Sequence, residues 1–476
     1  MLQKLYILFS LLFLAAGAKA QWVTDKRNAK SIAISECDIF IHSNSAAVVK
    51  KAAALLQQDI AAVSGRRPSI VHSRNNNRSY IHIEAGDTSA IISSAIRKSN
   101  WIDAGWGFWE KGTIRIGKTK PNMPLQVYVN GGDPRGAAFA VMEMCRQLGI
   151  SPWYWWADAP IEKKNLFLNE NYFYEDGPQT KYRGIFINDE APALSNWARE
   201  KMGGFNHKFY DKVFELLLRL KANYIWPAMW GNAFYDDDSL NIRVAEQYGM
   251  VIGTSHHEPM MRAHDEWRRY HKGEAWNYET NAKTLQQYWT SSLIRASNEK
   301  IISLGMRGDG DEPMTRETAT NLLEKIVNDQ RNIIEKVTGK KAEETAQLWA
   351  LYKEVQDYYD KGMRVPDDVT LLLCDDNWGN LRRVPDPDLP KRSGGYGIYY
   401  HFDYVGGPRN YKWINTNPLP RIWEQMNLAR QFDARQIWIV NVGDIKPMEL
   451  PISFFLDMAW KKENELKADD IQSYTR

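Results

Sequence analysis

A repeating order of buried strand, polar loop and amphipathic helix begins after Asp176-Gly177-Pro178 and continues almost to the end of the 476-residue chain. The predicted strands lie at residues 182–188, 222–226, 250–254, 301–306, 369–374, 397–401 and 437–441. Near-continuous apolar strands joined by helices indicate a parallel sheet with both faces covered. An open doubly wound sheet is an alternative, but the number of units favours a (β/α)8 TIM-type barrel over residues 176–460, although only seven strands are evident.

The preceding residues, 21–175, predict a separate α/β domain. Apolar residues recur at helical spacing from Val48 to Val63, and strands are predicted at 80–84, 113–116 and 125–129. The segment 131–136, Gly-Gly-Asp-Pro-Arg-Gly, opens a predicted helix over 137–148. It lacks the Lys-Ser/Thr of a phosphate-binding loop and the full dinucleotide fingerprint, so we interpret it as a tight strand-to-helix turn.

The composition excludes several classes of protein. The 61 Lys and Arg residues against 58 Asp and Glu leave a formal charge of only +3, so no basic field indicates a nucleic-acid partner. Hydrophobic residues make up 44% of the chain, which argues against disorder. The 19 Trp, 23 Tyr and 16 Phe residues supply flat faces that fill cores or stack against ligands, a composition that suits a carbohydrate enzyme.

The N-terminus predicts a signal peptide over residues 1–20. Lys4 precedes a mostly apolar stretch over 5–17, and Ala18-Lys19-Ala20 has the small-x-small form of a cleavage site. The stretch is shorter than the ~20 residues that span a bilayer. We therefore expect a secreted or periplasmic protein with no membrane partner after cleavage. The three cysteines, Cys37, Cys145 and Cys374, are too few and too scattered for a disulfide framework and are interpreted as core residues.

Polar residues follow six of the seven predicted strands. These ends carry Asn188-Asp189-Glu190, His256-His257-Glu258, Arg307 to Glu312, Asp375-Asp376-Asn377-Trp378, His401-Phe402-Asp403-Tyr404 and Asn441-Val442-Gly443-Asp444. In a barrel all of them meet at the C-terminal face, where such enzymes build their active sites. Polar loops and helix caps explain one such end, but not six.

Several carboxylates around one pocket, without a nucleophilic Ser or Cys motif, suit glycosidic cleavage by one acid and one base or nucleophile. Arg307 could pair with those carboxylates in a structural ion pair, or it could bind an acidic substrate through two hydrogen bonds. His256, His257 and Glu258 are adjacent and cannot all face one ion from a regular strand, so neither a metal nor another cofactor is predicted.

Four segments are long enough to be specific: the stretch 182–190 (YRGIFINDE), the run 222–230 (ANYIWPAMW), the segment 305–313 (GMRGDGDEP) and the tail 450–457 (LPISFFLD). They resemble glycoside hydrolase family 115, the xylan α-1,2-glucuronidases. The resemblance covers essentially the whole mature chain.

The resemblance implies an N-terminal α/β domain, a (β/α)8 catalytic barrel, a helical bundle and a C-terminal β domain. It also implies a secreted or periplasmic inverting exo-enzyme that removes glucuronic acid or 4-O-methylglucuronic acid from glucuronoxylan, with a possible homodimer in the longer form. Family members are longer than this sequence, so we expect residues 461–476 to begin a following helical region that is truncated here.

By the same resemblance, Glu354 is the candidate general acid, although the residues alone predict a solvated position on a helix between the fourth and fifth strands. Asp311 is the candidate base, and Asp375 competes with it because it closes a strand. The implied sugar-binding set comprises Asp189, Arg307, Asn377, His401, Tyr404 and Asn441.

Two other functions remain open. A substrate-assisted β-N-acetylhexosaminidase also couples a small α/β domain to a barrel and carries adjacent Asp and Glu after the fourth strand, as Asp311-Glu312 does here. The second alternative is a non-catalytic, degenerate glycan-binding protein, which the expected truncation makes plausible.

Overall fold

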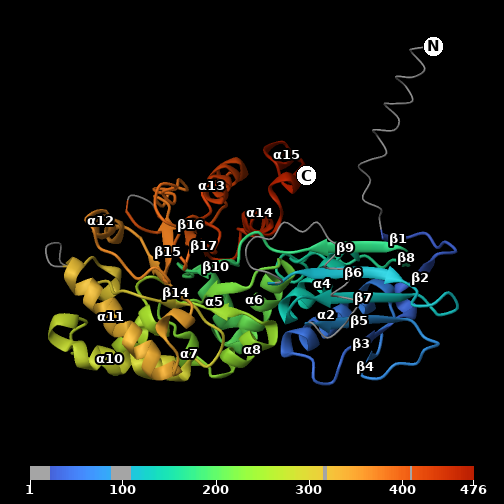
Figure 1. The fold of residues 1–476 in the computed structure, drawn as a ribbon, viewed down its shortest axis with the longest axis horizontal. Helices are drawn as coiled ribbons and strands as arrows, with labels where there is room; N and C mark the ends of the chain where they lie inside the picture. Colours follow the sequence, from blue (N-terminus) through green and yellow to red (C-terminus); the bar gives the residue numbers. More distant parts are fainter. Residues whose placement is uncertain (1–21, 87–108, 315–318, 408–409, 476) are drawn as a thin grey trace, which may run out of the picture. The chain divides into compact units, whose positions relative to one another are not determined.

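The computed structural model describes residues 22–86, 109–314, 319–407 and 410–475 (Figure 1). The predicted signal peptide lies outside these residues. The chain forms two compact units, the first ending at Asp176 and the second continuing from Gly177.

The first unit is built on a six-stranded mixed sheet, in which β6 runs antiparallel to both of its neighbours. In spatial order the strands are β4 (Ile70–Val71), β3 (Asp38–Phe40), β5 (Tyr80–Ala85), β7 (Gln126–Gly131), β6 (Gly112–Gly117) and β9 (Tyr172–Asp176). Helices α2 (Ala47–Ser64) and α4 (Pro134–Gln147) pack on each other and on β5. A small antiparallel sheet joins β1 (Val23–Thr24), β8 (Phe167–Asn169) and β2 (Ser31–Ala33).

The glycine-rich segment after β7 is the predicted turn. A Cβ at Gly131 would lie 2.0 Å from the backbone nitrogen of Ala137, so only glycine fits where the chain folds back. Asp133 caps α4 by accepting a hydrogen bond from the Gly136 N–H at 2.8 Å. This cap starts the helix at Pro134, three residues before the predicted start.

The second unit is an eight-stranded parallel barrel, as predicted, and not an open sheet. Its strands are β10 (Tyr182–Ile187), β11 (Tyr224–Trp226), β12 (Val251–Ile252), β13 (Ile302–Ser303), β14 (Gln347–Ala350), β15 (Thr370–Cys374), β16 (Tyr396–His401) and β17 (Ile437–Gly443). The sheet closes between β12 and β13. There Ile252 forms a parallel bridge with Lys300, and the Ile301 N–H donates to the Ile252 carbonyl at 3.1 Å.

The strand that sequence reasoning missed is β14. All four of its residues are buried, and it pairs with both β13 and β15. The expectation that Glu354 lies at a solvated position along a helix is therefore wrong. Glu354 is the first residue of α12 (Glu354–Asp360) and follows the end of β14 by only a few residues.

Helices surround the barrel. They are α5 (Ala193–Met202), α6 (His207–Arg219), α7 (Phe234–Asp237), α8 (Leu240–Tyr248), α9 (His264–Tyr270), α10 (Tyr278–Arg295), α11 (Ala319–Thr338), α12, α13 (Leu419–Gln431), α14 (Glu449–Trp460) and α15 (Ile471–Tyr474). Helix α6 shows why they form. Asn206 caps its N-terminus, and the predicted apolar face that contains Phe209, Val213 and Leu217 is buried.

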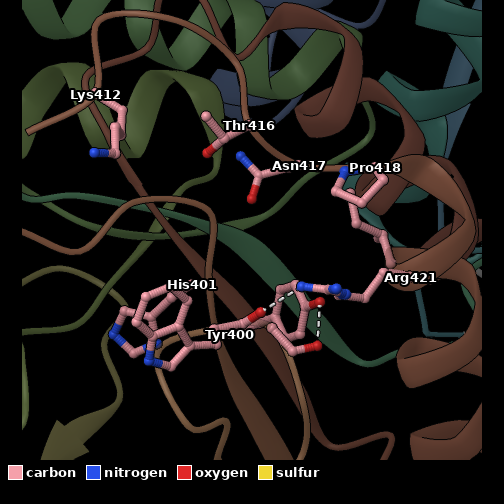
Figure 2. Close-up of a pocket in the computed structure, with 10 residues that line it drawn as sticks. Tyr400, His401, Lys412, Thr416, Asn417, Pro418 and Arg421 are labelled. Atoms are coloured by element: carbon pink, nitrogen blue, oxygen red, sulfur yellow. Dashed lines mark hydrogen bonds between the residues drawn. The ribbon is translucent and has the colours of Figure 1, made fainter. Parts of the chain in front are cut away.

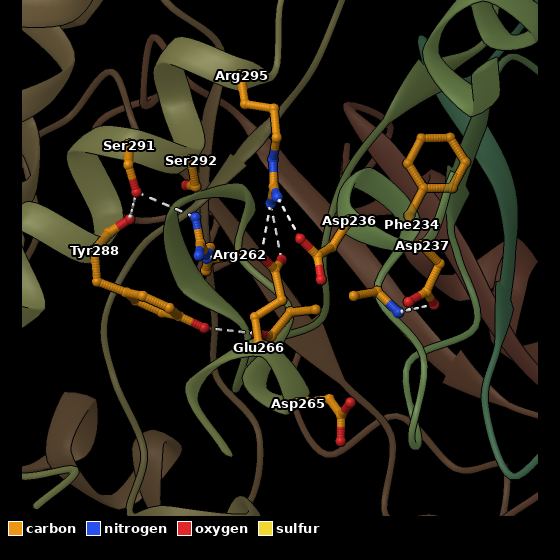
Figure 3. A network of polar contacts seen from close by, with 12 residues as sticks. Phe234, Asp236, Asp237, Arg262, Asp265, Glu266, Tyr288, Ser291, Ser292 and Arg295 are labelled. Carbon is orange, nitrogen blue, oxygen red and sulfur yellow. Dashed lines mark hydrogen bonds and ion pairs between the residues drawn. The ribbon is translucent and has the colours of Figure 1, made fainter. Parts of the chain in front are cut away.

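A buried polar network links α7, α9 and α10 (Figure 3). Glu266 is fully buried and accepts hydrogen bonds from Arg295 at 2.8 and 3.0 Å, while Arg262 lies 3.1 Å from the same carboxylate. Arg295 also reaches Asp236 at 3.3 Å. Because each charge is paired, the network fixes the loops that follow β11 and β12 without leaving a buried charge uncompensated.

The three cysteines are buried and unpaired with one another, which confirms their interpretation as core residues. Among the described residues, none of the helices combines the length and the apolar character that crossing a bilayer requires.

Candidate active site

The carboxyl ends of the eight parallel strands meet at one end of the barrel, and the predicted site residues follow them. Asp189 follows β10, Arg307 and Asp311 follow β13, and Glu354 follows β14. The remaining members come from β15, β16 and β17 and the loops after them: Asp375, Asn377, His401, Tyr404 and Asn441.

Arg307 joins the predicted acid, Glu354, to the predicted base, Asp311. Its Nε and Nη2 donate to the two oxygens of Glu354 at 2.9 and 2.8 Å, and its Nη1 donates to the carboxylate and backbone oxygens of Asp311. The Arg307 side chain is only 2% exposed, whereas those of Asp311 and Glu354 are 19% and 18% exposed. A single buried guanidinium thus holds both carboxylates in place.

Asp311 is further surrounded by two histidines. Its Oδ1 lies 3.2 Å from His256 Nε2 and 3.3 Å from His257 Nδ1. Burial alone would raise the pKa of the Asp311 carboxyl, but His257, His256 and Arg307 outweigh it and hold that pKa well below its usual range. Burial lowers the pKa of His257 to about 3, so this imidazole is neutral at physiological pH.

The same cluster has the spacing of a metal site, since ligand atoms of His256, His257 and Asp311 lie within 4.8 Å of one another. The fit is poor, because Arg307 already donates to the Asp311 oxygen that a metal would need. His256 Nδ1 and His257 Nε2 also have no hydrogen-bond partner in the described part of the chain, whereas ligating histidines usually donate from their second nitrogen. Glu258 points elsewhere and accepts the His264 N–H at 2.8 Å.

Asp375 is a positioning group for His401. Its side chain is 0% exposed, its Oδ1 lies 2.5 Å from His401 Nδ1, and its Oδ2 accepts the His401 N–H at 3.2 Å. The imidazole stacks on Tyr352, with ring centroids 5.6 Å apart. Asp375 therefore lacks the exposed oxygen that Asp311 offers to a water molecule.

A second group of carboxyls lies after β10 and β16. Burial raises the pKa of Asp189 to about 7, and the neighbouring Asp403 adds to this shift. Asp189 also adopts a left-handed backbone with φ of 31°. Burial raises the pKa of Glu190 to about 8, while its Oε1 accepts the Trp230 N–H at 3.1 Å and the Asn232 amide at 3.2 Å.

The sequence model described as glycosyl hydrolase family 115 matches residues 175–476. A solved family 115 4-O-methyl-α-glucuronidase with specificity for decorated arabinogalactans is 33% identical, with a TM-score of 0.82. That alignment covers 93% of this chain and 58% of the other enzyme. The chain belongs to glycoside hydrolase family 115. It spans less than two thirds of the length of this relative, and no match was found among curated proteins.

More distant structures share the fold of this family 115 chain. A β-hexosaminidase from Streptomyces plicatus is 10% identical, with a TM-score of 0.58 over 94% of this chain and 91% of its own. An enzyme of family 138 that targets pectin rhamnogalacturonan II is 13% identical, with a TM-score of 0.54 over 90% of this chain and 51% of its own. These likenesses support the barrel assignment.

The remaining predicted residues of the family 115 site hold the aromatic side chains near His401. Asn377 has a left-handed backbone, φ 64°, and its side chain hydrogen bonds to Tyr352. The Asn441 side chain hydrogen bonds to Tyr399 and accepts the Gly443 N–H at 2.9 Å. Tyr404 is half-buried beside His401.

Two residues that sequence reasoning missed complete the site. Trp230 is 39% exposed, donates its indole N–H to Asn188 at 2.7 Å and stacks on His257. Lys353 follows the missed strand β14, and its ammonium lies 5.1 Å from the ring centroid of Tyr352. Lys353 could have been found from the sequence by its position at a strand end. The sequence did not point to Trp230, because the loop after β11 starts with Pro, Ala and Met.

The first prediction compares two arginines that each hold a carboxylate. Arg307→Lys keeps the charge but loses the planar fork that spans Glu354 and Asp311, so we expect kcat/KM on a glucuronic acid-decorated polysaccharide to fall about tenfold or more. Arg331→Lys is the matched control, because Arg331 holds Asp368 through two hydrogen bonds, of 2.7 and 3.1 Å, at the opposite end of the barrel. Both variants should lose similar thermal stability. An equal loss of activity in both would contradict the special position of Arg307.

The second prediction concerns Glu258, whose pKa burial raises to about 8. The unfolded chain ionises this group near pH 4.3, so the folded state binds the extra proton, and that stabilisation is lost as pH rises from ~4 to ~8. Glu258→Gln mimics the neutral form. Between pH 5 and pH 8 the Tm of the wild type should therefore decrease by roughly 2 °C or more beyond the decrease seen in the variant.

Glu266→Gln serves as the control for this pH series, because it removes a charge that faces Arg295 and Arg262. Its Tm should be lower than that of the wild type at every pH. A Glu258→Gln curve that runs parallel to the wild-type curve would refute the assignment of a raised pKa.

Proposed function

We propose that this chain is the catalytic part of a secreted or periplasmic α-glucuronidase. It would release glucuronic acid or its 4-O-methyl form, α-1,2-linked to xylan, with inversion at the anomeric carbon. The observation that carries the proposal is the Glu354–Arg307–Asp311 cluster, which sets two partly exposed carboxylates on one buried cation. Family membership supports glycosidic hydrolysis, and the specificity of the similar enzyme for decorated arabinogalactans adds a second substrate to test.

In the proposed reaction Glu354 protonates the departing sugar oxygen and Asp311 activates the attacking water. Glu354 accepts two hydrogen bonds from Arg307, so it must leave the guanidinium before it can donate a proton. A substrate uronate supplies the means, because its carboxylate matches the same guanidinium fork. Binding of an acidic sugar to Arg307 would thus free Glu354 for its role as acid.

The hexosaminidase alternative depends on adjacent Asp and Glu side chains after the fourth strand. Asp311 enters the cluster, but Glu312 is exposed, and the carboxylate that shares Arg307 with Asp311 is Glu354. This arrangement favours the glucuronidase. The non-catalytic alternative does not explain why two partly exposed carboxylates share one buried cation.

One assay separates the three functions. The protein is incubated with glucuronoxylan, with glucuronic acid-decorated arabinogalactan and with a chitobiose analogue. Release of glucuronate or its 4-O-methyl form supports the proposal, and the faster of the two polymers identifies the backbone. Release of N-acetylglucosamine, or of no sugar, would refute the proposal.

The stereochemical prediction is that β-glucuronate is the first product of an α-linked substrate. Inverting pairs stand ~6.5–9.5 Å apart to leave room for water, whereas retaining pairs stand ~5–5.5 Å apart. A proton NMR time course follows the anomers before they equilibrate by mutarotation. If α-glucuronate forms first, the enzyme retains configuration and Asp311 cannot act as the base proposed here.

The acid role predicts a substrate-dependent defect for Glu354→Gln. The amide cannot protonate a departing sugar oxygen, so kcat on the polysaccharide should fall by roughly 10²–10⁴-fold. A nitrophenyl leaving group needs little protonation, so the defect on an aryl α-glucuronide should be much smaller. Asp189→Asn is the comparison, because burial raises the pKa of Asp189 to about 7 and this carboxyl also follows a strand of the barrel. Near-normal polysaccharide turnover by Glu354→Gln, with the large defect in Asp189→Asn, would move the acid role to Asp189.

A further inference from the structure

A cavity of about 320 Å³ adjoins the candidate active site on the side of β15, β16 and α13 (Figure 2). His401 lines this cavity and also belongs to the site described above. The other lining side chains that matter here are Trp378, Lys412, Asn417 and Arg421. Figure 2 shows Lys412, Thr416 and Asn417 along one side of the space and Tyr400 and His401 along the other.

Trp378 is held as a fixed, exposed platform at this cavity. Its backbone N–H donates to the Asp376 carboxylate at 2.9 Å, and its carbonyl accepts from Arg421 Nη1 at 2.9 Å. Asp376 is anchored in turn by the Asn380 amide at 2.8 Å. The backbone is thus fixed from both sides while half of the residue's surface, 50%, stays exposed. A large aromatic side chain kept in water at the edge of a pocket is typical of a surface that a sugar ring covers.

The cavity is also electropositive. Lys412 and Arg421 line it, and none of the described residues that line it is acidic. Two neighbouring carboxylates are occupied elsewhere, since Asp375 binds His401 and Asp376 binds the backbone of its own loop. Two cations beside a flat aromatic face complement a pyranose ring that carries a carboxylate.

We propose that this cavity is a subsite for a second acidic sugar of the same polysaccharide, adjacent to the one that is cleaved. The proposal rests on the proposed glucuronidase function. Trp378 would cover one face of the sugar ring, while Lys412 and Arg421 would bind its carboxylate. The subsite would make the enzyme favour chains with closely spaced uronate branches over chains with isolated ones.

The test measures kcat/KM on three substrates: an oligosaccharide with two neighbouring uronate branches, the same backbone with one branch, and an aryl α-glucuronide that does not reach the cavity. Trp378→Ala and Lys412→Gln should each lose about tenfold on the doubly branched substrate. Both should stay within about twofold of the wild type on the aryl glucuronide. Added salt should reduce the preference for two branches, because the contact is between charges at the surface.

Trp413→Ala is the matched control. Trp413 follows Lys412 in the same loop and is 76% exposed, but it does not line the cavity. Its removal should leave all three substrates unaffected. Equal losses on every substrate in Trp378→Ala and Lys412→Gln, or no loss on any, would overturn the subsite.

A binding measurement keeps this test separate from the glucuronidase proposal. If the wild type does not hydrolyse the aryl glucuronide or either oligosaccharide, the function fails and the subsite is judged by calorimetry. The probes are the doubly branched oligosaccharide, its carboxyl-reduced form and inorganic sulfate. The subsite predicts that the acidic form binds about tenfold more tightly than the reduced form, and that Lys412→Gln removes the difference. Sulfate that competes as well as the oligosaccharide would reveal a simple anion site and refute the proposal.

Discussion

The rest of the site depends on the pairing of the Arg307 guanidinium with two carboxylates. The guanidinium is buried, it is always charged, and it contacts Glu354 through two hydrogen bonds and Asp311 through a third donor. These contacts tie the loop after β13 to the start of α12. A buried cation with one carboxylate removed would be strongly destabilising, so the fold requires at least one of them to stay. Two carboxylates on one cation leave a net negative charge, and a substrate uronate would add another. In the proposed reaction, a proton on Glu354 relieves this excess of negative charge. Binding of the acidic sugar would then also supply the protonated acid that the reaction needs.

Two histidines complete the site. Burial lowers the pKa of His257, so its neutral ring lies beside Asp311 without adding a second cation. On the other side of the site, Asp375 fixes the orientation of His401, whose ring stacks on Tyr352. These supports stand at strand ends, which are the most rigid parts of the barrel, so little reorganisation is required when a sugar binds.

The periodicity of the sequence was sufficient to predict the barrel and the polar strand ends, because both follow from which residues are buried. It failed at β14, because the apolar residues of this strand continue into Leu351 and Tyr352, so no polar residue marks the end of the strand before α12. Because β14 was missed, Glu354 was placed on the surface of a helix and not at a strand end. Only the resemblance therefore indicated a role for it. The left-handed backbones of Asp189, Asp311 and Asn377 were equally unpredictable. Asp and Asn tolerate this conformation, but nothing in the local sequence requires it.

The likeness to the hexosaminidase concerns the fold alone. Two chains can share the barrel at a TM-score of 0.58 with only 10% identity, because closure of the sheet needs only buried apolar strands. In the proposed mechanism, the chemistry belongs to the loops after β13 and β14. Here the loop after β13 turns Asp311 toward Arg307 and leaves Glu312 in solvent, while β14 delivers a carboxylate from the next strand to the same cation. An arginine at this position brings together acids from two neighbouring strands, where an adjacent Asp-Glu pair would draw both from one loop. In the proposed function, the cation that assembles the pair also matches the charge of a uronic acid, so a single side chain would both organise catalysis and select an acidic sugar.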